Sequence, residues 1–205
     1  QLILTAPHSD HIARLLLDFA VAIELVHTSS LILDDLPCMD DAKFRRDKEC
    51  LHLETSEAEA TLVAFSLLAR AFETLSNGAP EETQVRQILS RLLSRSLGGG
   101  GMAEGQALEL RHTLGDTDEI SRLKTASLFS VSTEGVGWIL SRSPIEIKKL
   151  REFGLSVGLA FQTLDDIQDE DGESIEILKS KMTAHLNNAK EQIQQLDVVF
   201  NEYHL

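Results

Sequence analysis

The most constraining feature of the sequence is a three- and four-residue spacing of apolar side chains that recurs in segment after segment. Between residues 10 and 33 it runs through Ile12, Leu15, Leu16, Phe19, Ala20, Ile23, Val26 and Ile32. This spacing places the apolar side chains on one face of an α-helix. No segment shows a convincing strand-like alternation of apolar and polar residues. The sequence therefore predicts an all-α fold, a helical bundle of about seven to nine helices around one core.

Six further segments repeat the helical spacing: residues 58–75, 84–97, 102–110, 120–140, 145–167 and 175–203. The turn-forming pair Asn77 and Gly78 ends the first of these, and four glycines at 98–101 mark a break or a tight packing point. With 205 residues, of which 42% are apolar, the chain can bury one substantial core. A single domain over residues 1–205 is therefore the default expectation.

Two clusters of aspartates stand where two of these apolar segments end. LDDLPCMDD covers residues 33–41, and LDDIQDEDG covers residues 164–172. Carboxylates at the C-terminal end of a helix lie near the negative end of its dipole, so a cation should compensate them. Magnesium is commonly held by carboxylates together with phosphate oxygens of a substrate. Each cluster alone could be a solvated acidic helix end, but the pair indicates a metal and diphosphate site if the two ends face each other.

The first cluster contains an insertion that needs explaining. Asp40 follows Asp34 by six residues, which does not keep both on one face of an ideal helix. Pro37 lacks an amide donor and is expected to distort the helix, so that Asp40 returns toward the pair at 34 and 35. Arg45 and Arg46 come next and could either bind a diphosphate or neutralise the aspartates beside them.

Charge and composition exclude several classes of function. The net charge of −14 argues against a general binder of nucleic acid, which needs a basic surface. Cys38 and Cys50 are too few for a disulfide framework or a zinc site, which favours a reducing compartment. We expect no membrane span and no secretory leader. A soluble, cytoplasmic protein is the resulting expectation, and the start at Gln1 suggests that an N-terminal part has been removed or is not shown.

Five blocks, in order along the chain, carry a resemblance to a known family. They are ELVHTSSLILDD at 24–35, the continuation to Arg46, GMAEGQALEL at 101–110, RLKTASLF at 122–129 and FQTLDDIQD at 161–169. Together they resemble the trans-type polyprenyl diphosphate synthases, especially the geranylgeranyl and farnesyl diphosphate synthases. The resemblance implies a helical bundle around a central cavity and a homodimer. It also implies that magnesium, as three ions, ionises an allylic diphosphate, whose carbocation is then attacked by isopentenyl diphosphate.

The resemblance also assigns roles to residues of this chain. The implied metal ligands are Asp34, Asp35, Asp40, Asp165, Asp166 and Asp169, with Asp41 less certain. The implied substrate-binding residues are His27, Arg45, Arg46, Lys124, Thr125 and Gln162, and the catalytic set consists of Lys124 with Asp34, Asp35, Asp40, Asp165 and Asp166. His27 could instead be a core histidine and Lys124 an ordinary helix lysine. Gln106 and Glu109 are expected to support the fold, and His52 receives no role.

The residues before Asp34 bear on the length of the product. Ser29 and Ser30 lie five and four residues upstream, where farnesyl enzymes of this kind commonly carry an aromatic residue at the first position. A serine there removes the floor of the tail pocket, so the resemblance favours farnesyl diphosphate as the starter and geranylgeranyl diphosphate as the product. Residues on other helices could substitute for that floor.

Three departures from the family pattern leave other functions open. The upstream Gly-Lys-Arg-x-Arg-Pro segment and the lysine-containing loop after Asp171 are absent from the sequence, and the usual Arg-Arg-Gly-Lys-Pro reads RRDKE at 45–49. A catalytically impaired regulatory or scaffold subunit is therefore one alternative. A farnesyl diphosphate synthase and a terpene cyclase are the others, although a cyclase would not need the paired arginines or the RLKT block.

Overall fold

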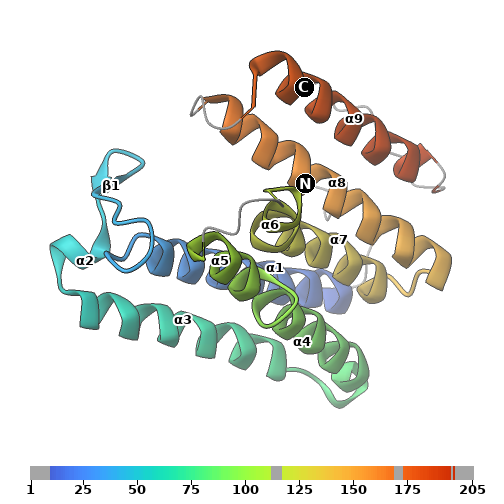
Figure 1. Ribbon diagram of the computed structural model, residues 1–205. Coiled ribbons are helices and arrows are strands. Elements are labelled where there is room, and N and C mark those ends of the chain that lie inside the picture. The colour runs from blue at the N-terminus through green and yellow to red at the C-terminus, as the bar shows by residue number, and fades with distance from the viewer. Residues whose placement is uncertain (1–9, 112–116, 169–172, 195, 197–205) are drawn as a thin grey trace. The chain divides into compact units, whose positions relative to one another are not determined.

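The computed structural model describes residues 10–111, 117–168, 173–194 and 196, and their regular structure is almost all helical (Figure 1). The helices are α1 (Asp10–Asp34), α2 (Leu51–Glu54), α3 (Glu57–Ser76), η1 (Pro80–Glu82), α4 (Thr83–Leu97), α5 (Met102–Leu110), α6 (Thr117–Ser121), η2 (Arg122–Ala126), α7 (Ser127–Ile139), α8 (Pro144–Gln168) and α9 (Ile175–Gln194). Here η1 is a 3₁₀-helix and η2 a π-helix. The all-α prediction is confirmed.

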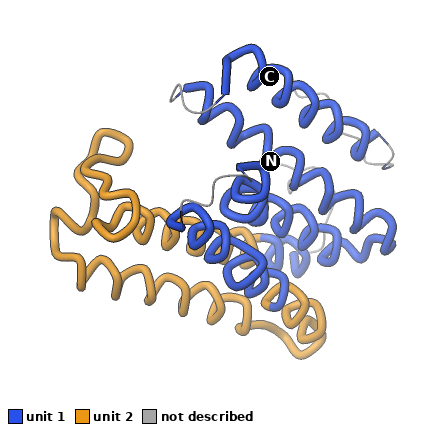
Figure 2. The backbone as a smooth tube through the Cα atoms, in the orientation of Figure 1, with its two compact units in different colours: residues 1–16, 91–205 blue, residues 17–90 orange. Residues whose placement is uncertain are grey.

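The chain divides into two compact units (Figure 2). Unit 2 comprises residues 17–90, and unit 1 comprises residues 1–16 together with 91–205. The long helices α1 and α4 each contribute to both units. The expectation of one domain over residues 1–205 stays a prediction.

In unit 2, α1 packs against α3 through small side chains. Ser29 is fully buried, and its hydroxyl donates a hydrogen bond of 2.9 Å to the Ala64 carbonyl of α3. Ala60 and Ala64 on α3 and Ala22 on α1 are also fully buried. Small residues at these positions allow two helix backbones to approach closely, so the apolar face of α1 predicted from the sequence is partly used to hold α3.

A buried arginine joins several helices of unit 2. Arg86 is 5% exposed and donates to Asp18 on α1 at 2.7 Å and to Glu82 at the end of η1. It also donates to the carbonyls of Thr74 and Leu75 at 3.4 and 3.5 Å. Burial by itself would lower the pKa of Arg86, but the hydrogen bonds to Asp18 and Glu82 outweigh it and raise that pKa. The guanidinium therefore stays charged and links three elements.

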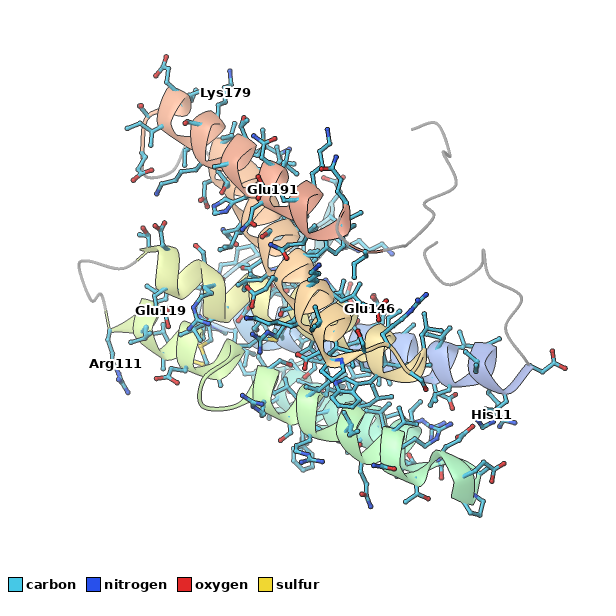
Figure 3. All side chains as sticks on the ribbon, turned by 90° about the vertical axis from the view of Figure 1, so that its right-hand side faces the viewer. His11, Arg111, Glu119, Glu146, Lys179 and Glu191 are labelled. Atoms are coloured by element: carbon cyan, nitrogen blue, oxygen red, sulfur yellow. The ribbon has the colours of Figure 1, made fainter. Side chains whose placement is uncertain are left out.

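In unit 1, α8 lies between α7 and α9 (Figure 1). Glycines bring it close to its neighbours, since a Cβ on Gly158 would lie 2.6 Å from the Ala126 Cα. Thr133 on α7 donates 2.6 Å to the Leu150 carbonyl of α8. On α9, Leu178 is buried, whereas Lys179 and Glu191, both labelled in Figure 3, are exposed. The apolar periodicity of the sequence therefore corresponds to the faces that pack in this unit.

Two local features differ from the expectations. The predicted helix at 120–140 is interrupted by the π-turn η2, so it forms three consecutive elements. A short antiparallel hairpin of β1 (Phe44–Arg45) and β2 (Lys48–Glu49) was also missed. Its two-residue loop is Arg46 and Asp47, with φ of 51° and 64°, as a type I′ turn requires. Strands of two residues carry too little alternation to be recognised from sequence.

The length and apolar character of helix α1 have to be compared with the expectation that the chain has no membrane span. Among the described residues it is the one helix that is long and apolar enough to cross a bilayer. Length and composition alone support this, and core helices of globular folds pass the same criterion. The absence of a span stays a prediction.

Candidate functional site

The first aspartate motif is a compact turn at the end of α1. The helix ends at Asp34, and the Asp40 amide donates back to the Asp34 carbonyl at 2.9 Å. Pro37 lies inside this turn, and it disfavours helical backbone at Leu36, which precedes it. The return of Asp40 toward Asp34 therefore occurs as expected, although the helix ends before the proline instead of being distorted by it.

Asp35 and Arg45 are bound to each other. Arg45 Nε lies 2.9 and 3.0 Å from the two Asp35 oxygens, and Nη2 lies 2.6 Å from Oδ1. The hydrogen bond to Asp35 raises the pKa of Arg45 against the opposing effect of burial. Burial, and secondly Asp35, raise the pKa of the neighbouring Cys50 thiol, which therefore stays protonated. The first motif thus already holds one of the cations expected to bind a diphosphate.

The two consecutive arginines occupy different environments. Arg45 sits in β1, half-buried, whereas Arg46 is exposed in the hairpin loop. Both hypotheses for the pair, diphosphate ligands or local neutralisers, are compatible with this placement. Arg45 forms an ion pair of 2.6 Å with Asp35 of the motif. The hairpin therefore places the two guanidinium groups in different surroundings.

His27, Ser29 and Ser30 lie on the last turns of α1. His27 is half-buried, and its carbonyl accepts a hydrogen bond of 2.9 Å from Ser30 Oγ. The Ser29 hydroxyl is directed at α3 through the Ala64 carbonyl. The roles of His27 in isopentenyl diphosphate binding and of Ser29 and Ser30 in chain length stay predictions.

In unit 1, three residues expected to act together form one hydrogen-bonded chain. The Thr125 hydroxyl donates to Gln162 Oε1 at 2.6 Å, and Gln162 Nε2 donates to Asp166 Oδ1 at 2.9 Å. These contacts join η2 to the last turns of α8, where the second aspartate motif begins. The Gln162 amide can therefore take only one orientation between a donor and a carboxylate.

The π-turn determines where Lys124 and Thr125 lie. A π-turn inserts one extra residue into a helix and is frequent at functional sites. A Cβ on Gly105 of α5 would lie 2.5 Å from the Lys124 amide nitrogen, so α5 sits directly against η2. Lys124 Nζ lies 2.5 Å from Glu109 Oε2 on α5. Sequence reasoning assigned Glu109 to the fold and missed this pair.

The magnesium ligands are only partly testable. Asp165 and Asp166 are half-buried on the last turn of α8, and Asp169 lies outside the described residues. Within the described ranges, no three His, Cys, Asp or Glu side chains are grouped so as to hold a metal ion. The donors of both motifs are all carboxylates, the oxygen ligands that Mg²⁺ prefers. The donor chemistry therefore fits magnesium, and the assembly of the six aspartates stays a prediction.

Comparison with known proteins identifies the family. The model of the family described as "Polyprenyl synthetase" matches residues 2–195. The chain is a member of the polyprenyl synthetase family. Its relatives include a farnesyl diphosphate synthase of Micrococcus luteus, 36% identical over 85% of this chain and 61% of that protein. A geranylgeranyl diphosphate synthase of Pantoea ananas is 36% identical over 75% of this chain and 53% of that protein.

Solved structures resemble this polyprenyl synthetase family member over most of its length. A geranyltransferase of Helicobacter pylori, complexed with magnesium and isoprenyl diphosphate, has a TM-score of 0.83 and 30% identity over 97% of this chain and 76% of that one. An FPP/GFPP synthase of Zymomonas mobilis has a TM-score of 0.82 and 30% identity, covering 92% of this chain and 72% of that one. The chain spans about half to three fifths of the two curated relatives named above.

Proposed function

We propose that this family member is a prenyltransferase that joins isopentenyl diphosphate to an allylic diphosphate and releases pyrophosphate. The observation that carries the proposal is the chain from Thr125 through Gln162 to Asp166, at 2.6 and 2.9 Å. It connects two residues expected at a diphosphate with a carboxylate expected at a metal. In the other unit, the ion pair of Arg45 with Asp35 likewise joins a residue expected at a diphosphate to a carboxylate expected at a metal.

Different residues of the chain would bind the metal ions and the two substrates. Asp34, Asp35, Asp40, Asp165, Asp166 and Asp169 would hold magnesium, which when bound supplies charge neutralisation to the departing pyrophosphate. The Helicobacter pylori relative complexed with magnesium and isoprenyl diphosphate supports the choice of magnesium. Arg45 and Lys124 would place their charges on diphosphate oxygens, and Thr125 and Gln162 would orient the allylic end. His27 and Arg46 would bind isopentenyl diphosphate.

We extend the proposal to the length of the product and to the oligomeric state of the protein. Relatives carry both the farnesyl and the geranylgeranyl name at 36% identity, so the identities do not separate the two products. The serine at position 29 favours farnesyl diphosphate as starter and geranylgeranyl diphosphate as product. We further propose three magnesium ions per site and a homodimer located in the cytoplasm.

An elongation assay tests the activity. The full chain is incubated with magnesium, labelled isopentenyl diphosphate and, in separate reactions, farnesyl diphosphate or a shorter allylic diphosphate, and the products are separated by chromatography. Geranylgeranyl diphosphate is the expected product, and Asp34→Ala should abolish it while leaving the helical circular dichroism spectrum intact. Elongation of shorter starters only as far as farnesyl diphosphate would instead indicate a farnesyl synthase. A cyclic hydrocarbon would establish a terpene cyclase, and no elongation would refute the proposed activity.

A further inference from the structure

The Lys124 ammonium is held by a carboxylate of its own chain. Its Nζ lies 2.5 Å from Oε2 of Glu109, and the two side chains are 23% and 44% exposed. An anion that approaches Lys124 therefore meets a negative charge at the same place. Because Lys124 is one of the cations assigned to the diphosphate, its pairing with Glu109 bears directly on which anions can bind.

This pairing is built into the packing of α5 on η2. Gly105 has no room for a side chain, since its Cβ would lie 2.5 Å from the backbone nitrogen of Lys124 and 2.9 Å from its Cα. Glu109 follows Gly105 by four residues, and residues spaced by four share one face of a helix. The same close approach that seats α5 on η2 thus places the Glu109 carboxylate over Lys124. A chance meeting of two flexible surface side chains would not have this support.

Lys124 and its neighbour Thr125 are held by different chemistry. Thr125 is bound through a neutral donor and acceptor pair to Gln162, whose amide in turn donates to Asp166. Lys124 is bound by a full opposite charge. The attraction of Lys124 for an anion is therefore reduced by its partner, as that of Arg122 in the same π-turn is by Glu119, while the polar contacts of Thr125 have no such effect.

We propose that Glu109 is a specificity-determining residue that suppresses the binding of metal-free phosphate anions at Lys124. A free pyrophosphate carries its full negative charge, so it must compete with Glu109 for the ammonium and is repelled by it. A diphosphate that arrives with divalent cations has a smaller net charge, so the same carboxylate opposes it less. Glu109 thereby favours metal-complexed diphosphates over free ones. This inference rests on the proposed function, because it takes Lys124 as a diphosphate ligand.

Calorimetric titration of the full chain with inorganic pyrophosphate tests the proposal. The titration is made once in a chelator and once in excess magnesium, for the wild type and for Glu109→Gln. In chelator, Glu109→Gln should bind pyrophosphate about threefold to tenfold more tightly than the wild type, the effect of releasing one partly exposed ion pair. In magnesium, the gain should be smaller. Adding Lys124→Gln to the Glu109→Gln chain should remove the gain.

Glu104→Gln is the matched control, because it removes one negative charge from the same helix at an exposed position. Its carboxylate accepts from the Gly100 amide, a contact that glutamine can still make. A gain in Glu104→Gln equal to that in Glu109→Gln, or weaker binding in Glu109→Gln than in the wild type, would overturn the inference. If either of these two results is found while the wild type still binds pyrophosphate in magnesium, the inference about Glu109 fails but the proposed activity does not. Absence of pyrophosphate binding in every variant, with and without magnesium, would overturn both.

Discussion

The Asp35 carboxylate accepts hydrogen bonds from Nε and Nη2 of Arg45, the shortest of them at 2.6 Å. Asp35 is 5% exposed, whereas the Arg45 side chain is 38% exposed. A buried carboxylate that accepts from two N–H groups on one edge of a guanidinium fixes the plane of that group. We therefore expect Asp35 to act chiefly by orienting Arg45, and Asp34 and Asp40 to contribute more to metal binding.

Asp35→Asn should separate these roles. We expect the KM for the allylic diphosphate to rise more than the magnesium concentration needed for half activity, because Arg45 loses its orientation. The free energy of unfolding should fall by about 1–3 kcal/mol, the range for a hydrogen bond to a charged group. Asp41→Asn is the control, since Asp41 pairs with Lys43 at 2.7 Å and both side chains are exposed. If Asp35→Asn changed the magnesium requirement alone, the orienting role would be wrong.

Arg86 is expected to be the most costly single charge to remove from unit 2. Arg86→Met leaves Glu82 and Asp18, which are 4% and 23% exposed at their side chains, without their cation. Losing one member of a buried ion pair costs about 3–5 kcal/mol. Urea unfolding followed by circular dichroism measures this loss. Arg70→Met, which breaks an exposed pair with Glu73, should cost less than about 1 kcal/mol, and an equal loss in both variants would contradict the account.

The hairpin loop carries backbone strain that glycine would relieve. Asp47 has a φ of 64°, and a non-glycine residue there costs about 1 kcal/mol in the left-handed region. Asp47→Gly should therefore raise the melting temperature slightly, by less than the full strain because glycine is also freer in the unfolded chain. Lys48→Gly, in β2 beside the loop, should lower it. A lower melting temperature for Asp47→Gly would show that this loop is not strained.

His185 should make the stability of the protein depend on pH. Burial lowers the pKa of His185, with Lys181 acting in the same direction and Asp118 opposing it. The unfolded chain therefore takes up this proton at a higher pH than the folded chain, so the contribution is fully present above about pH 6.5 and is lost as the pH falls below it. His185→Gln should lose less stability than the wild type between about pH 7.5 and 5.5. An equal loss of unfolding free energy in the wild type and in His185→Gln between these two pH values would contradict this.

Sequence patterns predicted the helices well where one face is buried. The range 102–110 is α5 to the residue, and α1 ends one residue beyond its predicted end. The π-turn could not be predicted because a π-turn disturbs the apolar spacing of a helix by only one residue. The Arg86 network was missed for a different reason: Asp18 lies 68 residues from Arg86 along the chain, and only the packed unit brings them together.

The sequence indicated candidate residues of the site but not the hydrogen bonds and ion pairs between them. The five matching blocks indicated Thr125, Gln162 and Asp166, and the structure joins them by hydrogen bonds of 2.6 and 2.9 Å. Nothing in the spacing of Arg45 and Arg46 indicated that only the first would pair with Asp35, because a hairpin of two-residue strands separates them. The pair of Glu109 with Lys124 was missed since an acidic residue on an exposed helix face has no distinctive sequence signal.

The central proposal is that both aspartate motifs bind divalent metal ions together with a diphosphate. A crystal structure of the full chain grown with Mn²⁺ and inorganic pyrophosphate, with the manganese located by anomalous scattering, tests this most directly. We expect manganese ions bound between the pyrophosphate and carboxylates of both motifs, Asp34 and Asp40 from one and Asp165 and Asp169 from the other. Manganese and pyrophosphate bound by one motif while the other faces solvent would contradict the account.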